Sequence, residues 1–265
     1  MCHHLTGICL IEVSLFGGAC VITPHPEKSL EYVVLLRRRL PPLLRRLSLF
    51  QDFDKLGLVH HLMTVPSSRR DLPPPALSAL GHALAKSSRN LEELSLAFIV
   101  DAKDFLYQFS PLSETGVEAK KKWKNLTTLS LTSSSLRDPR QSAQPIRDLL
   151  EAAGNAARIM PKLETMEIWN ALSGEGAVFR YDRRHGGNGS PAITWTTLWS
   201  SDLDPRVIAA WERAIPEKEK LMVNTRLMVA PQSYGSLLHL LKLRDRMLHP
   251  VSLFQIELAM KNISP

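Results

Sequence analysis

Residues 44–49, with the sequence Leu-Arg-Arg-Leu-Ser-Leu, are the first of four similar stretches that decide the expected fold. The apolar residues follow the spacing Leu-x-x-Leu-x-Leu, and the later copies begin at Leu91, Leu126 and Leu163. The last copy carries methionine and isoleucine at the second and third apolar positions. Because side chains alternate between the two faces of a β-strand, each copy is typical of a strand that buries one face in a shared core.

Segments with helical character lie between these copies. Residues 77–84 keep a helical spacing of leucines, and Pro145 suits the first turn of a helix over 146–160. A further helix is expected over residues 27–40. Strand and helix therefore alternate, which predicts an α/β protein with an irregular leucine-rich-repeat-like solenoid and a parallel sheet over residues 27–170.

The pattern changes after the fourth copy. Residues 177–181 and 193–198 are typical of two strands, and the glycine-rich segment 182–191 between them suits a hairpin turn. We therefore predict that residues 171–265 form a C-terminal β-hairpin and a helical cap that closes the open end of the solenoid. Residues 1–26 are expected to be a separate N-terminal segment, the remnant of an earlier repeat.

Several elements are expected within the cap. Asp204 followed by Pro205 is typical of a helix start. A strand is predicted over residues 221–229 and an amphipathic helix over residues 234–248. Ser252, with a glutamine three residues later, suits the capping box of a last helix.

Composition limits the class of protein. The chain has 265 residues, of which 44% are apolar and 22% charged, as in ordinary globular proteins. No stretch approaches the ~20 apolar residues of a membrane helix, so no membrane partner is expected. The three cysteines lie in the first twenty residues, an odd count that fits a reducing compartment, the cytoplasm or the nucleus. Cys2, His3, His4 and Cys9 lack the paired ligand spacing of a zinc site, so no metal is predicted.

The net charge of +7 leaves two interpretations open. The basic residues form either a solvated outer face or, as the alternative function, a nucleic-acid-binding surface. No zinc-finger spacing or aromatic RNA-binding strand accompanies them. The basic clusters are Arg37–Arg39, Arg45–Arg46, Lys120–Lys124 and Arg180–Arg184.

Catalytic motifs are missing from the sequence. It contains no GxSxG elbow, no HExxH, no phosphate-binding loop with lysine and no dinucleotide fingerprint, so no enzyme activity and no cofactor are predicted. The carboxylate pairs Asp101/Asp104 and Asp202/Asp204 stand beside expected helix starts, where aspartate satisfies free N–H groups. A cryptic hydrolase is the remaining enzyme alternative, and it would need a pocket that joins a histidine, a carboxylate and a hydroxyl group.

The residues between the leucines are expected to form a partner-binding surface on the concave side of the sheet. Arg46 and Glu93 are placed to pair across neighbouring strands. Phe50 and Trp169 are either exposed aromatic anchors for a partner or are covered by the long loops. The predicted partner-binding residues are Arg46, Ser48, Phe50, Glu93, Ser95, Thr128, Ser130, Glu167 and Trp169.

The sequences of several stretches resemble those of a fungal family with no established activity. Members of that family are similar to F-box-type leucine-rich-repeat proteins. The resemblance runs from about Leu43 to the C-terminus. The stretches that carry it are residues 44–50, 90–96, 160–170, 192–195, 233–236 and 248–253.

The resemblance implies a non-catalytic protein-interaction scaffold, the substrate-recognition part of a degenerate F-box-type protein. In longer proteins of this type the F-box binds a Skp1-type adaptor. The Leu-Pro-x-Glu opening of that module is not found here: its nearest equivalent, Leu40-Pro41-Pro42-Leu43, lacks the acidic residue. The resemblance therefore suggests a Skp1-type adaptor as a partner, whereas the absence of the Leu-Pro-x-Glu motif argues against it.

Overall fold

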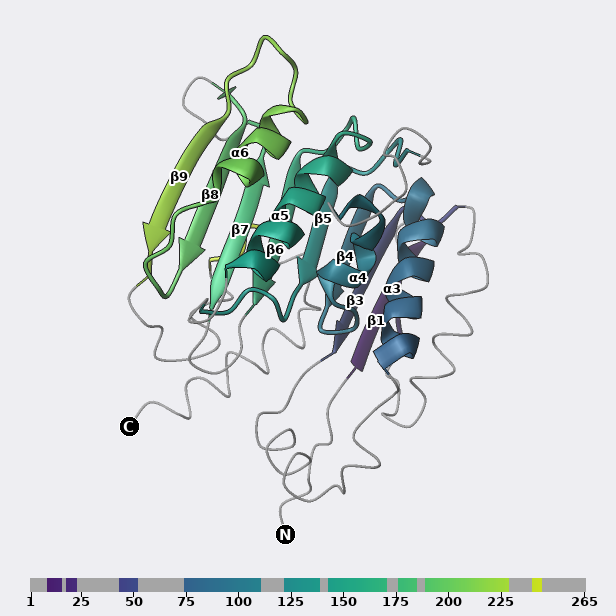
Figure 1. The fold of residues 1–265 in the computed structure, drawn as a ribbon. Coiled ribbons are helices and arrows are strands. Elements are labelled where there is room, and N and C mark those ends of the chain that lie inside the picture. The colour runs from purple at the N-terminus through teal and green to yellow at the C-terminus, as the bar shows by residue number, and fades with distance from the viewer. Residues whose placement is uncertain are drawn as a thin grey trace, which may run out of the picture.

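The structure is a computed structural model that describes nine segments of the chain. These are residues 9–15, 18–22, 43–51, 74–110, 122–138, 143–170, 176–184, 189–228 and 240–244. Together they form a mixed α/β protein built on one open sheet (Figure 1). The predicted helices over residues 27–40 and after Ser252 lie outside the described residues.

One nine-stranded sheet holds every described strand, in the order β2-β1-β3-β4-β5-β6-β7-β8-β9. The strands are β1 (Cys9–Leu15), β2 (Gly18–Ile22), β3 (Arg46–Gln51), β4 (Glu93–Ala97), β5 (Thr128–Thr132), β6 (Thr165–Asn170), β7 (Ala177–Asp182), β8 (Ala192–Thr197) and β9 (Met222–Leu227).

The four sequence copies are the four central strands β3 to β6, which are parallel and adjacent. Their middle apolar residues stand level with one another: Leu47 pairs with Leu94, Leu94 with Leu129, and Leu129 with Met166. The predicted parallel sheet of repeated strands is confirmed in this register. The leading leucine of each copy comes just before its strand and is buried as well.

The ends of the sheet are built differently. β1 and β2 form an antiparallel hairpin, and β1 is antiparallel to β3, so residues 9–22 do not continue the parallel arrangement. At the other end β7 and β8 form the predicted hairpin, with Ala177 opposite Thr197 and Asp182 opposite Ala192. The predicted strand over 221–229 is β9, which pairs in parallel with β8.

The described helices lie on one side of the sheet (Figure 1). They are α3 (Pro74–Ser87), α4 (Ala102–Phe105), α5 (Gln144–Ala157) and α6 (Pro205–Glu212), with short 3₁₀ helices at Ser88–Asn90 and Tyr107–Phe109. Proline stands in the first turn of α5 and α6, where its missing N–H costs no hydrogen bond. The side chain of Asp204 accepts a hydrogen bond from the N–H of Arg206 and so caps α6, as the sequence predicts.

The hydrophobic core fills the space between the helices and the sheet. The leucines of β3 to β6 belong to one buried cluster with the apolar residues of α5, including Leu149 and Leu150. α5 and α6 approach closely at Gly154, where an added Cβ atom would lie 3.0 Å from the Cβ of Ala210.

The predicted helix over residues 234–248 is wrong at residues 240–243, which form a turn instead. Apart from these residues and Arg244, the predicted helix lies outside the described residues.

Candidate functional site: the sheet face opposite the helices

The strand register defines a second face of the sheet, which we call the outer face. Its residues alternate with the core leucines and therefore point away from the helices. Across β5 to β8 they stand in three rows: Thr128, Thr165, Asp182, Ala192; then Ser130, Glu167, Arg180, Thr194; then Thr132, Trp169, Val178, Thr196. Continuing to β3 and β4, the first two rows include Arg46, Glu93, Ser48 and Ser95.

On β3 and β4 the outer-face side chains differ in their exposure to solvent. The Arg46 side chain is 62% exposed, and its Nε lies 3.4 Å from Oε1 of Glu93, so the predicted cross-strand pair is confirmed. Ser48 is half-buried on the neighbouring row. The side chain of Phe50 lies outside the described residues.

The β5–β6 part of the outer face is buried, and the expectation of an open concave surface is wrong there. Ser130, Glu167 and Trp169 are 1%, 0% and 0% exposed, and Thr128 and Ser95 are nearly as buried. The indole N–H of Trp169 donates to the hydroxyl of Ser130 at 3.2 Å. Trp169 is therefore no exposed anchor, and the alternative in which it is covered by other parts of the chain applies.

Part of the cover over Trp169 comes from the turn that follows β4. Phe98 has a φ of +61°, a left-handed backbone that a bulky residue adopts only when its surroundings hold it. Its N–H donates to the hydroxyl of Thr132 at 2.8 Å. The Phe98 ring then meets the Trp169 ring edge-on, with 5.2 Å between the ring centres. This turn thus closes one side of the buried tryptophan.

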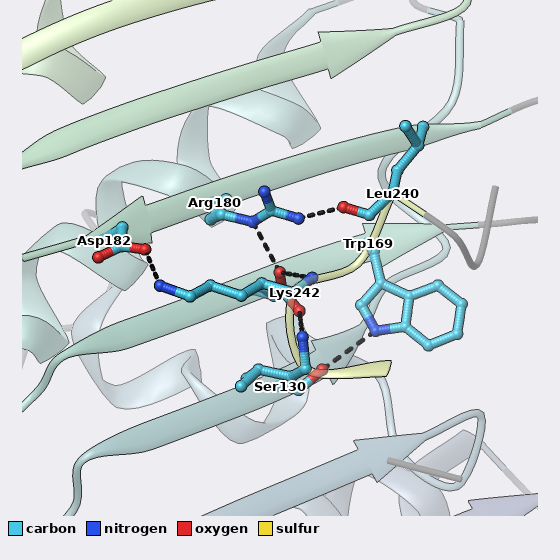
Figure 2. A network of polar contacts seen from close by, with 8 residues as sticks. Ser130, Trp169, Arg180, Asp182, Leu240 and Lys242 are labelled. Atoms are coloured by element: carbon cyan, nitrogen blue, oxygen red, sulfur yellow. Dashed lines mark hydrogen bonds and ion pairs between the residues drawn. The ribbon is translucent and has the colours of Figure 1, made fainter. Parts of the chain in front are cut away.

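Residues 240–244, which we call the clasp, lie across the outer face (Figure 2). The backbone N–H groups of Lys242 and Leu243 both donate to the carboxylate of Glu167, at 2.7 Å and 3.2 Å. Leu241 and Leu243 are buried, yet they are not part of the core between helices and sheet. The clasp is therefore held by its backbone and by two apolar side chains.

Two charged residues of β7 complete the contact with the clasp (Figure 2). The Nε of Arg180 lies 2.7 Å from Oε1 of Glu167, and its guanidinium also donates to the carbonyl oxygen of Leu240. The carboxylate of Asp182 forms an ion pair with the ammonium of Lys242. Sequence reasoning placed Arg180 only in a basic cluster and left Asp182 in the hairpin turn.

The local sequence signal for Arg180 was its alternation with apolar neighbours along β7. Phe179 and Tyr181 are both buried on the helix side, which forces Arg180 onto the outer face. Its pairing with Glu167 follows from the antiparallel register of β6 and β7. That register depends on the reversal of the chain between the two strands, which the sequence pattern alone does not specify.

The clasp supplies partners for two buried carboxylates, those of Glu167 and Asp182. A buried carboxylate needs a partner and hydrogen-bond donors, since its desolvation is costly. Lys242 pairs with Asp182, and the clasp backbone supplies two donors to Glu167. The arrangement binds a cationic, N–H-rich segment and has no nucleophile activated by a base.

The other candidate carboxylates are structural. Asp101 caps α4 by accepting from the N–H of Lys103 at 3.0 Å, and it also accepts from the hydroxyls of Ser133 and Ser134. Asp104 accepts from the hydroxyl of Ser78 at 2.8 Å. In the described part of the chain, no three His, Cys, Asp or Glu side chains gather in a way that could hold a metal ion.

A small cavity of about 220 Å³ lies on the helix side, between the ends of α5 and α6 and β7. Tyr181 lines it beside Arg158 and Arg183. Burial raises the pKa of Tyr181 to about 12, against the opposing effect of the Arg183 charge. Arg183 is tied to the carbonyl oxygen of Pro161 at 3.0 Å. The described lining contains no histidine or carboxylate, so it lacks the set that a hydrolase would need.

Residues 39–249 match a family of unknown function (DUF6546). The chain belongs to this family. No curated protein and no solved structure matches the chain. In this DUF6546 chain the matched range includes β3 to β9, the helices and the clasp, and so contains the whole candidate site. Among the described helices, none is both long and apolar enough to cross a membrane.

Proposed function

We propose that the protein is a non-catalytic protein-interaction scaffold that uses the outer face of its sheet. The observation that carries this proposal is the clasp: the outer face holds a protein segment through its backbone, a lysine and two leucines. Backbone hydrogen bonds, an ion pair and buried apolar side chains are also contacts that hold two polypeptides together. On β3 of the same face the side chain of Arg46 is 62% exposed and is therefore accessible to a partner.

The scaffold is of the leucine-rich-repeat-like solenoid type in this proposal, with residues 27–170 as the repeats and 171–265 as the cap. The support is the shared register of Leu47, Leu94, Leu129 and Met166, and the placement of the described helices on one side. The resemblance to F-box-type proteins suggests the substrate-recognition part of a degenerate member. In that role the protein would work in the cytoplasm or nucleus.

The contacts of the described arginines on and beside the outer face do not support the nucleic-acid alternative. Arg45 and Arg46 pair with Glu92 and Glu93, and Arg180 is committed to Glu167. A guanidinium that neutralises a carboxylate is not available to release counterions from phosphates. We therefore propose protein, rather than nucleic acid, as the partner.

Affinity purification from a fungal extract tests the proposal. The natural chain is compared with Arg46→Glu, which reverses an exposed charge on the outer face. Lys218→Glu is the matched control, because Lys218 is also an exposed cation but lies in the turn between α6 and β9. We expect proteins that the natural chain and the control recover and that Arg46→Glu loses at least several-fold.

Three outcomes decide between the alternatives. Equal recovery by all three chains contradicts an interaction surface at the β3–β4 end of the outer face. Recovery that disappears when the extract is treated with nuclease indicates nucleic acid as the partner instead. Co-purification of a Skp1-type adaptor supports the F-box-type role, and its absence from otherwise specific complexes limits the proposal to a scaffold without adaptor.

A further inference from the structure

The site under the clasp is already organised by the sheet itself. Glu167 and Arg180 stand opposite each other on β6 and β7 and pair at 2.7 Å. Asp182 comes from the same strand as Arg180 and points to the same face. Strand backbone therefore positions all three residues that bind the clasp.

The contacts with the clasp define a short recognition pattern. Glu167 accepts from two successive backbone N–H groups, and Arg180 donates to a carbonyl oxygen two residues before the first of them. Backbone groups carry no sequence information, but the ion pair of Asp182 favours a cationic side chain at one position, which is lysine in the clasp. The buried residues on either side of Lys242 are leucines. The pattern is therefore apolar–Lys–apolar in a turn.

We propose that this part of the outer face is a docking site for a leucine–lysine–leucine turn, and that the clasp is its internal occupant. The ligand in trans is a partner protein that presents the same chemistry: a turn with two consecutive free N–H groups, a lysine and two flanking leucines. This inference rests on the proposed scaffold function and names the partner's chemistry. The ion pair of Asp182 with Lys242 favours a cationic segment.

The internal occupant controls access to the site. A tethered segment competes with an effective concentration that is on the order of millimolar for a short linker. Eleven residues, 229–239, connect the end of the described β9 segment to the clasp. A partner must therefore outcompete the clasp, and weakening the clasp should raise the apparent affinity for any such partner.

Fluorescence polarisation with a labelled peptide tests the proposal. The peptide has the sequence of residues 238–248, and a second peptide carries alanine in place of the lysine. The proteins are the full chain, the full chain with Leu241→Ala and Leu243→Ala, and the full chain with Lys242→Glu. Lys242→Glu replaces the ion pair with Asp182 by a repulsion between two carboxylates and so weakens the clasp, while Leu241 and Leu243 keep their side chains.

We expect the lysine peptide to bind at least tenfold more tightly to both clasp variants than to the natural chain. Adding Asp182→Asn to a clasp variant should remove most of the preference for lysine over alanine at that position. Unchanged affinity after weakening of the clasp, or equal binding of the two peptides, overturns the proposal. Loss of the thermal unfolding transition in both clasp variants overturns it too, because the clasp would then be an integral part of the core.

Failure of this inference is distinguishable from failure of the proposed function. If the peptide does not bind while Arg46→Glu still loses specific proteins, the scaffold function stands and the clasp site is only structural. If the peptide binds but no protein depends on Arg46, the docking site stands and the β3–β4 end is not part of it. The two experiments change residues on different strands and can fail separately.

Discussion

Replacing Glu167 with glutamine should lower the free energy of unfolding by about 2–4 kcal/mol. A hydrogen bond to a charged group contributes about 1.5–3 kcal/mol, and removing one partner of a buried ion pair costs about 3–5 kcal/mol. Glu167 accepts from Arg180, Lys242 and Leu243, and its side chain is fully buried. Glutamine keeps one carbonyl oxygen but turns an NH₂ group toward donors. Arg180 is 21% exposed, so water offsets part of the loss.

Urea unfolding followed by tryptophan fluorescence measures this change, with the melting temperature as a second readout. For a chain of this size the expected fall is roughly 5–15 °C, from about 2–4 °C per kcal/mol. Glu92→Gln is the control, because its pair with Arg45 lies on the surface with side chains 41% and 55% exposed. An exposed pair contributes about 0–1 kcal/mol. If the two variants differ by less than ~0.5 kcal/mol, the account of Glu167 as the centre of the outer face is refuted.

Three further predictions concern burial. Trp169→Ala should cost about 3–5 kcal/mol in urea unfolding, because the side chain is fully buried, whereas an exposed anchor would cost almost nothing. Gly154→Leu should lower the free energy of unfolding by about 1–3 kcal/mol, because a Cβ atom added at Gly154 would lie 3.0 Å from atoms of Ala210 and Trp211. An unchanged unfolding midpoint would contradict the close α5–α6 contact. For Tyr181 the folded pKa of about 12 exceeds the unfolded value of 10.0, so its contribution is present below pH 10 and is lost as the pH rises through 12. The loss between those pH values should be on the order of 2 kcal/mol, and Tyr181→Phe should not show it.

The central sheet followed from local information in the sequence. Leu47, Leu94 and Leu129 occupy the same place in short repeated stretches, and side-chain alternation alone turns them toward one core. Aspartate and proline at 204–205 are equally local, and the start of α6 was predictable from them. These elements needed no knowledge of distant parts of the chain.

The outer face could not be predicted in the same way, because its cover is non-local. Glu167 and Trp169 alternate with the core residues of β6, and the clasp and the Phe98 turn, both distant in the sequence, make their surroundings an interior. The clasp itself was predicted as helix from its leucine spacing. Leu241 and Leu243 are two residues apart and are both buried, a spacing that places side chains on different faces of a helix. Docking onto the sheet outweighed the local preference.

Amide hydrogen exchange of the clasp tests the central claim most directly. The N–H groups of Lys242 and Leu243 are bound to Glu167, so both should be protected in the free chain. Adding the peptide of residues 238–248 at millimolar concentration should release the clasp and abolish that protection, while the amides of β5 and β6 stay protected. If Lys242 and Leu243 exchange freely in the unliganded chain, or stay protected while the peptide is bound, the clasp does not occupy an exchangeable docking site.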